Sequence, residues 1–341
     1  MGRKKKVSRL DYCQFLYATQ TNYTQTYFAE HLNEVSHDAI NRYLLNEKLT
    51  PKLVWEHTSA EIELSPNGAL LFDDTVLDKN SSQTMEIARY QYSGAAKRVI
   101  KGIGVVTCVY YNPDCHKFWV IDYRIYAPDQ DGKNKIDHVL DMFRSAIYSK
   151  KLDFKYVLMD SWYSTHKMML SINEEEKIFY CPLKSNRLVS RTDKRYYHHP
   201  VVELNWSEQE LQSGILVHLN KFPLSFHLKL FRITVNNHRT DLVVTNDLTQ
   251  NTTDTVQKVC GFRWKIEQFH REIKQLTGIE SCQCRKQRIQ RNHIACAILV
   301  WVKLKNIAYK TGQSIYQLKQ NLMRNYMIDQ LKNKETKMFF A

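Results

Sequence analysis

Apolar side chains recur every three or four residues between residues 8 and about 56, which is the spacing of helices that bury one face. Within this stretch, residues 23–32 predict one short helix, and Ser36 is a natural N-cap for a second helix over residues 37–45. Two short helices across a three- or four-residue turn form a helix-turn-helix, whose second helix enters a DNA major groove. An ordinary helical hairpin has the same pattern, and the glycine that is frequent in such turns is missing.

From about residue 67 the pattern changes to apolar runs rich in β-branched and aromatic residues, which is typical of strands. Residues 103–111 and 117–126 flank the turn sequence Asn112-Pro113-Asp114 and predict a hairpin. Further strands are expected over residues 69–74, 154–160 and 178–183, with helices over residues 134–149 and 164–173. Three strands, a helix, a strand, a helix and a strand predict an α/β fold, a ribonuclease H-like mixed sheet with flanking helices.

A mostly β insertion is expected next, because the helical pattern fades between residues 187 and 248. Strands are predicted there over residues 201–204, 215–219, 227–235 and 241–245, with Asn236-Asn237-His238 as the turn of the last pair. Helical patterns return from about residue 253 and again over residues 290–332. We therefore predict five regions: a helical DNA-binding region (1–60), the first part of the core (61–186), the β insertion (187–248), the rest of the core (249–285) and a C-terminal helical region (286–341).

The composition adds a strong basic bias: the net charge is +14 and the pI is about 9.3, with basic residues spread along the chain. Such a bias favours polyanionic partners such as nucleic acid, through phosphate contacts and counterion release, although a solvated basic surface has the same composition. The eight cysteines lack zinc-finger spacing, so reduced thiols are expected. No apolar run approaches the roughly 18 residues of a membrane span, and residues 2–6 are not followed by an apolar segment, so we expect neither a membrane partner nor a signal peptide.

One charged stripe stands out in the predicted helix after the insertion. Arg263, Glu267 and Lys274 are four and seven residues apart, so they share one side of a helix, with His270 beside them. A carboxylate flanked by fixed cations suits a metal site that also holds phosphate. Glu272 lies on the opposite side of the same helix and is expected to be solvated.

Two aspartates extend this candidate site. Asp74 ends the first predicted strand and Asp160 ends the fourth. Ligands bind at the ends of strands in open α/β sheets, and carboxylate oxygens are the ligands that Mg²⁺ or Mn²⁺ prefers. An Asp after a strand is also a common turn former. Within 73–78 three aspartates compete; Asp74 is favoured, followed by Asp73 and then Asp78.

These residues carry a resemblance to a known family. The chain resembles the DDE transposases of bacterial insertion sequences, in the branch with a Tyr-x2-Arg-x3-Glu-x6-Lys signature and a β-strand insertion before the catalytic Glu. The positions that match the signature and its companions are Arg263, Trp264, Ile266, Glu267, Phe269, His270 and Lys274. Asp-Asp-Thr at 73–75 resembles the first catalytic block, and Asp160 with Tyr163 resembles the second. The similarity is good over residues 67–280 and loose over residues 290–332. Cys260 stands where the signature expects Tyr.

The resemblance implies a function and roles for these residues. Asp74, Asp160 and Glu267 would be the catalytic residues and would hold two Mg²⁺ (or Mn²⁺) ions, so that water frees a 3′-hydroxyl that later attacks target DNA. Arg263 and Lys274 would clamp DNA phosphates. Tyr163 and His270 are further candidates for DNA contact. Where the opposite strand is cut through a hairpin, an extruded base rests on an aromatic ring, and Trp206 and Trp264 are candidates for it; plain packing is the alternative for both.

The implied partners are double-stranded DNA, namely transposon terminal inverted repeats and target DNA, and a second copy of the chain. Joining two ends to one target requires at least two protomers, so we expect a homodimer on DNA. The apolar positions of the C-terminal helical region either pair subunits or pack on their own core; they are Ile294, Ile298, Trp301 and Leu304. The alternatives are a metal-dependent DNA endonuclease that does not join strands and a catalytically silent, sequence-specific DNA-binding regulator. The expected location is the bacterial cytoplasm, at the nucleoid.

Overall fold

Helices occupy the N-terminal region of the computed structural model, as the apolar spacing predicts. They are α1 (Arg9–Ala18), α2 (Gln25–Glu30), α3 (His37–Asn46) and α4 (Pro51–Thr58). The side chain of Ser36 accepts a hydrogen bond from the backbone N–H of Ala39, which confirms Ser36 as the N-cap of α3. The two short helices of the predicted helix-turn-helix are therefore present as α2 and α3, which contact each other.

The structure describes residues 6–32, 35–81, 84–191, 197–235 and 239–332. Backbone contacts divide the chain into two units, each assembled from segments that are distant in sequence. Unit 1 comprises residues 1–61, 76–104 and 269–341, and unit 2 comprises residues 62–75 and 105–268. The five sequence regions proposed above stay a prediction.

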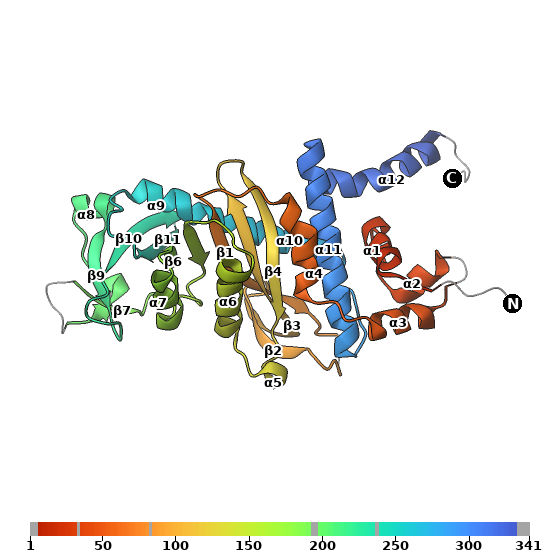
Figure 1. Cartoon of the computed structure of the whole chain (residues 1–341), viewed down its shortest axis with the longest axis horizontal. Coiled ribbons are helices and arrows are strands. Elements are labelled where there is room, and N and C mark those ends of the chain that lie inside the picture. Colours follow the sequence, from red (N-terminus) through yellow and green to blue (C-terminus); the bar gives the residue numbers. More distant parts are fainter. Residues whose placement is uncertain (1–5, 33–34, 82–83, 192–196, 236–238, 333–341) are drawn as a thin grey trace, which may run out of the picture. The chain divides into compact units, whose positions relative to one another are not determined.

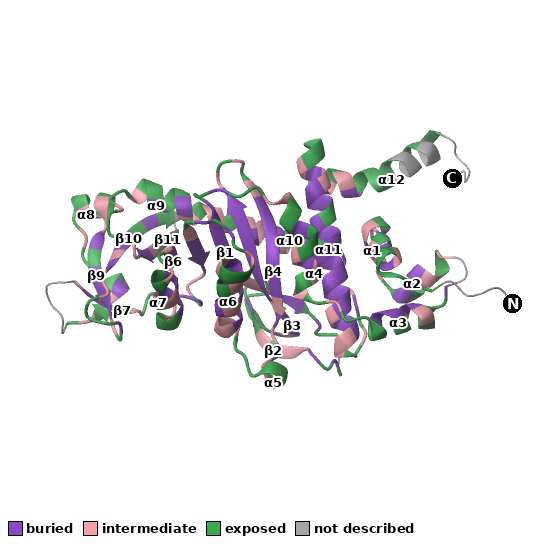
Figure 2. Ribbon diagram, in the orientation of Figure 1, coloured by how far each residue is buried: buried purple, intermediate pink, exposed green. Residues whose placement is uncertain are grey.

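Unit 1 is built around the long helix α11 (Gln287–Thr311), which is buried along most of its length (Figure 2). Helices α1, α3, α4 and α12 (Ile315–Lys332) contact it. The four apolar positions singled out in this segment are each at most 1% exposed: Ile294, Ile298, Trp301 and Leu304. These side chains therefore pack within their own chain, which is the second of the two alternatives given for them.

Glu272 is buried, so the expectation that it is solvated is wrong. It is 2% exposed, and its carboxylate accepts hydrogen bonds from the Trp301 indole at 2.9 Å and from Lys305 Nζ at 3.2 Å. Both partners lie on α11, which covers the side of α10 (Trp264–Leu276) that carries Glu272. The position on the helix shows which residues share a side, but the neighbour that covers that side comes from the tertiary fold.

Replacing Glu272 with alanine is expected to destabilise unit 1 by about 3–5 kcal/mol, because it leaves the buried ammonium of Lys305 without its anion. Urea unfolding of the variant measures this loss. The matched control is Glu56→Ala, which removes one partner of the exposed pair Lys52–Glu56 and is expected to cost about 1 kcal/mol or less. Equal effects of the two substitutions would show that the buried pair has no special role.

His293 is a second buried polar group of unit 1. Its Nδ1 accepts from the Tyr12 hydroxyl at 2.8 Å and its Nε2–H donates to the Gly278 carbonyl at 3.0 Å, which assigns a neutral ring. Burial lowers the pKa of His293 to about 4, below its ordinary value of 6.5. The unfolded chain therefore binds this proton first as the pH falls, so the stability due to His293 is complete above pH 7 and is lost toward pH 4.

This linkage predicts that the advantage of wild type over His293→Gln in free energy of unfolding shrinks by about 3 kcal/mol between pH 7 and pH 4. Urea unfolding of both proteins at pH 7, 5 and 4 measures the difference. Comparing the two proteins at each pH removes the contribution of the carboxylates that they share. A difference that does not change with pH would contradict the neutral buried ring.

The described strands form one mixed sheet, in the order β2-β3-β1-β5-β6-β11-β10-β9-β7-β8, with β4 also paired to β3 (Figure 1). The bounds are β1 (Ala69–Asp78), β2 (Arg89–Ser93), β3 (Arg98–Asn112), β4 (Lys117–Ile125), β5 (Tyr156–Met159), β6 (Ile178–Pro182), β7 (Leu188–Arg191), β8 (His199–Pro200), β9 (Ile215–Leu219), β10 (Leu228–Val235) and β11 (Arg239–Thr245). Strands β1, β5 and β6 are parallel neighbours, and the other pairs with a known register are antiparallel. The predicted hairpin is confirmed as β3–β4.

Several predicted elements differ from the structure. Residues 201–203 form a 3-10 turn, η3 (Val201–Glu203), where a strand was expected, and the helix α8 (Glu208–Ser213) follows within the predicted β insertion. The capping box of Ser207 and Glu210 starts that helix, a short polar signal without an apolar period. Strand β2 was not predicted, because its exposed tyrosines alternate with polar residues only briefly. The predicted turn at 236–238 lies outside the described residues.

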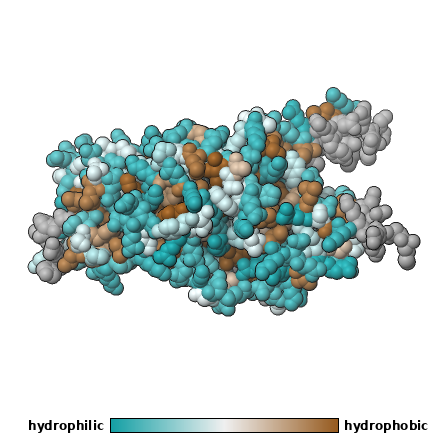
Figure 3. Space-filling model, in the orientation of Figure 1, coloured by the Kyte–Doolittle hydropathy of each residue, from teal (hydrophilic) through white to brown (hydrophobic). Residues whose placement is uncertain are grey.

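The strand ends also shift. Strand β1 continues to Asp78, so Asp74 lies inside it and does not end it, and Asp160 directly follows β5, the fifth strand in chain order. The helices on this part of the chain are α5 (Pro128–Asp131), α6 (Lys135–Arg144) with a π-helical turn η2 (Ser145–Ser149), and α7 (His166–Glu174). Hydrophilic residues cover most of the described surface in the view of Figure 3. Within the described ranges no helix is long and apolar enough to cross a membrane.

Candidate active site

Two neighbouring parallel strands of unit 2 bring Asp73 and Asp160 together. The register of β1 and β5 pairs Phe72 with Met159, and each aspartate follows its paired residue by one position. Side chains at equivalent positions of neighbouring strands point to the same face of the sheet, and successive side chains along a strand alternate. Asp73 therefore shares a face with the position of Asp160, and Asp74 points to the other face.

Asp74 is held by two partners. Its Oδ2 forms an ion pair with Lys135 Nζ at 2.5 Å, and its Oδ1 accepts a hydrogen bond from the Tyr163 hydroxyl at 2.6 Å. Tyr163 is 1% exposed. Burial and the neighbouring Asp74 raise the pKa of Tyr163 well above its usual value, so the phenol keeps the proton that it donates.

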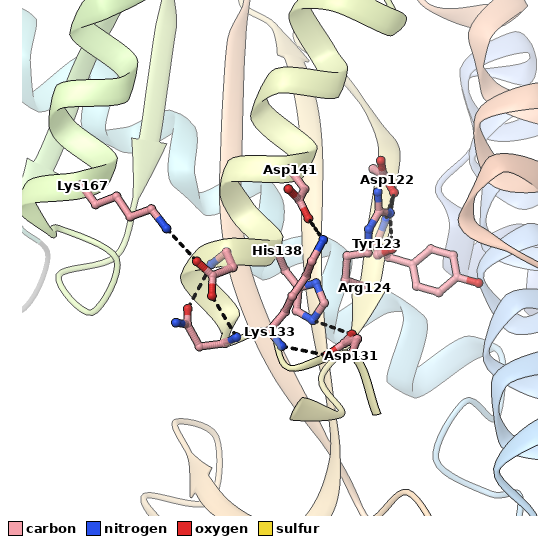
Figure 4. Close-up of polar contacts among 10 residues, drawn as sticks. Asp122, Tyr123, Arg124, Asp131, Lys133, His138, Asp141 and Lys167 are labelled. Atoms are coloured by element: carbon pink, nitrogen blue, oxygen red, sulfur yellow. Dashed lines mark hydrogen bonds and ion pairs between the residues drawn. The ribbon is translucent and has the colours of Figure 1, made fainter. Parts of the chain in front are cut away.

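Lys135 is placed by the start of α6. The side chain of Asn134 caps that helix and accepts from the N–H of Ile136 and Asp137. Two ion pairs hold this helix: Lys167 Nζ lies 2.8 Å from Asp137 of its first turn. Lys133 Nζ, just before the helix, lies 2.6 Å from Asp141 (Figure 4). The sequence contained the cap but no signal that linked the first residue of this helix to Asp74.

Arg263 connects Asp160 with Glu267, a carboxylate that lies more than a hundred residues later in the sequence. Its NH1 lies 3.4 Å from Asp160 Oδ1, and its NH2 donates to Glu267 Oε1 at 3.0 Å. Helix α9 (Thr253–Cys260) ends before the 3-10 turn η4 (Gly261–Arg263), and α10 begins at Trp264. The helix expected from about residue 253 is therefore present as α9, η4 and α10 in succession, and the four-residue spacing joins Arg263 to Glu267 as expected.

Asp73 belongs electrostatically to the same cluster. Burial raises the pKa of Asp73 to about 7, and the negative charges of Asp74 and Asp160 add to this, while Arg263 opposes it. The charges of Asp160 and Arg263 therefore both act on the Asp73 carboxyl. We use the name acid cluster for four residues: Asp73, Asp160, Glu267 and Arg263, whose guanidinium bridges Asp160 and Glu267.

The other predicted DNA-binding residues are spread over different environments. Lys274 donates to the Val76 carbonyl at 2.8 Å and pairs with Glu280 at 2.9 Å. Trp264 is 53% exposed at the start of α10. His270 is half-buried, with its ring 5.5 Å from that of Phe269. Trp206 is half-buried in the loop before α8. DNA contact by these side chains and by Tyr163 stays a prediction, and Tyr163 is placed as a residue that positions Asp74.

Cys260, the departure from the family signature, is the last residue of α9. Burial raises the pKa of its thiol to about 12, so it remains protonated at neutral pH. The family signature has a tyrosine at this position, and the protonated, largely buried thiol of Cys260 does not replace the hydrogen-bonding hydroxyl of that side chain.

The donor set suits divalent cations, since hard carboxylate oxygens are the ligands that Mg²⁺ and Mn²⁺ prefer. Within the described part of the chain, no three His, Cys, Asp or Glu side chains are close enough to hold a metal ion. The guanidinium of Arg263 lies against both Asp160 and Glu267 and supplies the positive charge between them. The acid cluster therefore fits a metal by the chemistry of its residues and is not gathered into a ligand shell.

Asp73 on β1, Asp160 directly after β5 and Glu267 on the later helix α10 are three carboxylates of unit 2, and Arg263 bridges the last two. The chain belongs to the Transposase DDE domain family, whose model matches residues 65–303. The protein is therefore a transposase enzyme, and members of this family generally use divalent metal ions. The matched range includes all four members of the acid cluster and Lys274.

Among solved structures, the chain is similar to one described as the cryo-EM structure of the piggyBac transposase synaptic complex with hairpin DNA. The TM-score is 0.50 at 12% identity, covering 99% of this chain and 76% of that chain. At this identity the likeness concerns the fold, and it confirms the expected mixed α/β sheet with helices. No curated protein sequence matches the chain.

Proposed function

We propose that this transposase cleaves the ends of a mobile DNA element and joins the freed 3′-hydroxyl to target DNA, in a cut-and-paste reaction. The observation that carries the proposal is the bridge of Arg263 between Asp160 and Glu267, at 3.4 and 3.0 Å. The bridge joins Asp160, directly after β5, to Glu267 on α10. These two residues belong to two of the sequence blocks by which the chain resembles the insertion-sequence transposases, for which we propose a ribonuclease H-like core. We assign the chain to that bacterial branch.

We further propose that Asp73, Asp160 and Glu267 hold the divalent ions, and that Asp73 takes the place first given to Asp74. The register of β1 and β5 supports this, because it places Asp73 on the face of Asp160. The contacts of Asp74 support it as well, since both of its oxygens already bind Lys135 and Tyr163. Asp74 then anchors β1 to α6 and the loop after β5.

Two bound Mg²⁺ or Mn²⁺ ions would activate water or the 3′-hydroxyl and stabilise the leaving oxygen of the phosphodiester. The protein supplies the rest of the site. Arg263 keeps Asp160 and Glu267 together and, in the complex, turns its planar fork to a DNA phosphate. Lys274, on α10, would provide a further cation for a DNA phosphate, and Glu280 holds it at 2.9 Å until DNA binds.

The proposed partner is double-stranded DNA, both the terminal inverted repeats and the target. The net charge of +14 supports binding to a polyanion, and the helices α2 and α3 supply a helix-turn-helix for end recognition. Joining two ends to one target requires a homodimer on DNA, in the nucleoid of a bacterial cytoplasm. Trp264, which is 53% exposed, remains a candidate to support an extruded base in a hairpin step, and the similar piggyBac transposase complex contains hairpin DNA.

Strand joining separates this function from simple cleavage. Purified protein is incubated with Mg²⁺, a supercoiled plasmid and a labelled DNA end that carries the inverted repeat flanking this gene and a ready-made 3′-hydroxyl. We expect the label to appear covalently attached to the plasmid. Cut plasmid without attached label would indicate an endonuclease that does not join strands, and end binding without either product would indicate a DNA-binding regulator.

A further inference from the structure

Two cysteines of unit 1, Cys282 and Cys284, lie in the irregular segment between α10 and α11. Their side chains are hydrogen-bonded to each other, so the two thiols are neighbours. The side-chain amide of Gln290 on α11 donates to both of their carbonyls, at 2.9 and 2.7 Å, and fixes the segment. Cys282 is buried, whereas Cys284 is partly exposed. An accessible thiol next to a sheltered one is the arrangement of a reactive cysteine with a resolving partner.

Fixed donors surround the sulfur of Cys284. Gln25, the first residue of α2, donates from its Nε2 to Cys284 Sγ at 3.2 Å. The ammonium of Lys79, held by the carbonyls of Glu280 and Cys282 at 2.5 and 2.7 Å, is near enough for its charge to act on the sulfur. The hydrogen bond from the Cys282 thiol has the largest effect. Together these groups favour the thiolate against the effect of burial and lower the pKa of Cys284 to about 7.

Cys115 has a similar exposure but opposite surroundings. It is also partly exposed. Burial raises the pKa of its thiol, and the hydrogen bond and the charge of Glu63 act in the same direction. The thiolate, and not the thiol, is the nucleophile of cysteine chemistry. At neutral pH a nucleophilic sulfur is therefore available at Cys284 and not at Cys115.

We propose that Cys284 is an oxidation site that reacts with hydrogen peroxide or an organic hydroperoxide, and that Cys282 is its resolving thiol. The Cys284 thiolate attacks one peroxide oxygen and breaks the O–O bond, which forms a sulfenic acid and releases hydroxide or alkoxide. The Cys282 sulfur then attacks the sulfenic sulfur, the S–O bond breaks, and the hydroxyl leaves as water with the thiol proton. Two thiols are oxidised to one disulfide, and one peroxide is reduced to two waters, or to water and an alcohol.

Oxidation removes the contact that ties α2 to this segment. A disulfide sulfur carries no charge and is a weak acceptor, so Gln25 Nε2 loses its partner. The Gln25 side chain is 8% exposed, and a buried donor that loses its acceptor favours opening of the helix that carries it. Helix α2 is the first helix of the helix-turn-helix. The oxidised protein therefore binds DNA ends more weakly, a consequence that rests on the end recognition proposed above.

Mass spectrometry of the full chain treated with hydrogen peroxide, without DNA, tests the oxidation site. Wild type is expected to form a disulfide between Cys282 and Cys284. Cys282→Ser should instead carry a sulfenic acid on Cys284 that dimedone traps, and Cys284→Ser should form neither product. Cys115 is the matched control and should react at least about 10-fold more slowly than Cys284. Oxidation of Cys13 and Cys296, the other neighbouring thiols of unit 1, ahead of this pair would overturn the proposal.

Hydrogen exchange measures the effect on α2, again without DNA. Peroxide is expected to speed exchange of the α2 amides in wild type roughly 2- to 10-fold, the range for loss of one hydrogen bond, and dithiothreitol should reverse it. Gln25→Ala should exchange at the faster rate with or without peroxide. Cys284→Ser should not respond to peroxide, and thermal unfolding checks that each variant is folded. Unchanged exchange in wild type that is fully oxidised by mass would overturn the link to α2.

Gel shifts with a DNA end that carries the inverted repeat separate this inference from the proposed function. Oxidised wild type is expected to bind the end roughly 2- to 10-fold more weakly than reduced wild type. Cys284→Ser should bind equally well with and without peroxide. Equal binding by the oxidised and reduced wild type would overturn the regulation of end recognition. A reduced protein that binds no end would refute the proposed function, and the mass and exchange measurements would still decide the oxidation site.

Discussion

Replacing Glu267 with glutamine is expected to abolish cleavage of the transposon end and to leave end binding unchanged. Glutamine is nearly isosteric and keeps an oxygen for the hydrogen bond from Arg263, which is 3.0 Å from Glu267. It removes the negative charge that would hold a divalent ion, whose stabilisation of the transition state is worth several kcal/mol. We expect the rate of cleavage to fall by at least about 10³-fold. Denaturing gels of a labelled end fragment measure cleavage, and gel shifts measure binding.

Glu203→Gln is the matched control, because Glu203 is an exposed glutamate of unit 2 outside the acid cluster. It should cleave and bind like wild type. Undiminished cleavage by Glu267→Gln would remove Glu267 from the proposed ligands. Loss of end binding by the same variant would mean that the residue supports DNA recognition and not the chemistry.

The substitutions Asp73→Asn and Asp74→Asn are expected to have opposite effects on activity and stability. Asp73→Asn should lose cleavage as Glu267→Gln does, because Asp73 shares the face of Asp160. Its stability should stay near that of wild type, since burial already favours the neutral form of this carboxyl. Asp74→Asn should retain measurable cleavage but lose about 2 kcal/mol or more of unfolding free energy, because Lys135 and Asp74 are only 12% and 17% exposed.

Urea unfolding and end cleavage of the two variants, assayed side by side, check both halves of this prediction. Lys135→Met reports on the same pair from the other side, and it should destabilise without abolishing cleavage. If Asp74→Asn is the inactive variant and Asp73→Asn cleaves normally, the first ligand is Asp74, as the sequence alone favoured.

Much of the fold was predictable because local signals agreed with the tertiary structure. The N-cap at Ser36, the β3–β4 hairpin and the apolar runs of β5 and β6 each contain a complete pattern within a few residues. Strand β2 and helix α8 lack such a pattern. The burial of Glu272 depends on Trp301 and Lys305, which follow it by about thirty residues, so no periodicity within its own helix reports it.

The site was predictable in its residue types and less so in its pairing. The spacing of Arg263 and Glu267 gave their contact correctly, even though a 3-10 turn interrupts the helix there. The choice between Asp73 and Asp74 depends on the register of β1 against β5, which a single strand does not contain. Lys135 was missed for the same reason, because its contact with Asp74 arises from a helix start that meets β1 only in the folded unit.

We propose that the acid cluster catalyses excision and joining of DNA with divalent ions. The most direct test of this proposal uses a donor plasmid that carries the inverted repeats flanking this gene, incubated with wild type or Asp160→Asn. Wild type with Mg²⁺ is predicted to release the element and a linear backbone, and neither wild type in EDTA nor Asp160→Asn with Mg²⁺ should do so. Release of the element by Asp160→Asn, or by wild type in EDTA, would show that neither Asp160 nor a divalent ion is needed for excision.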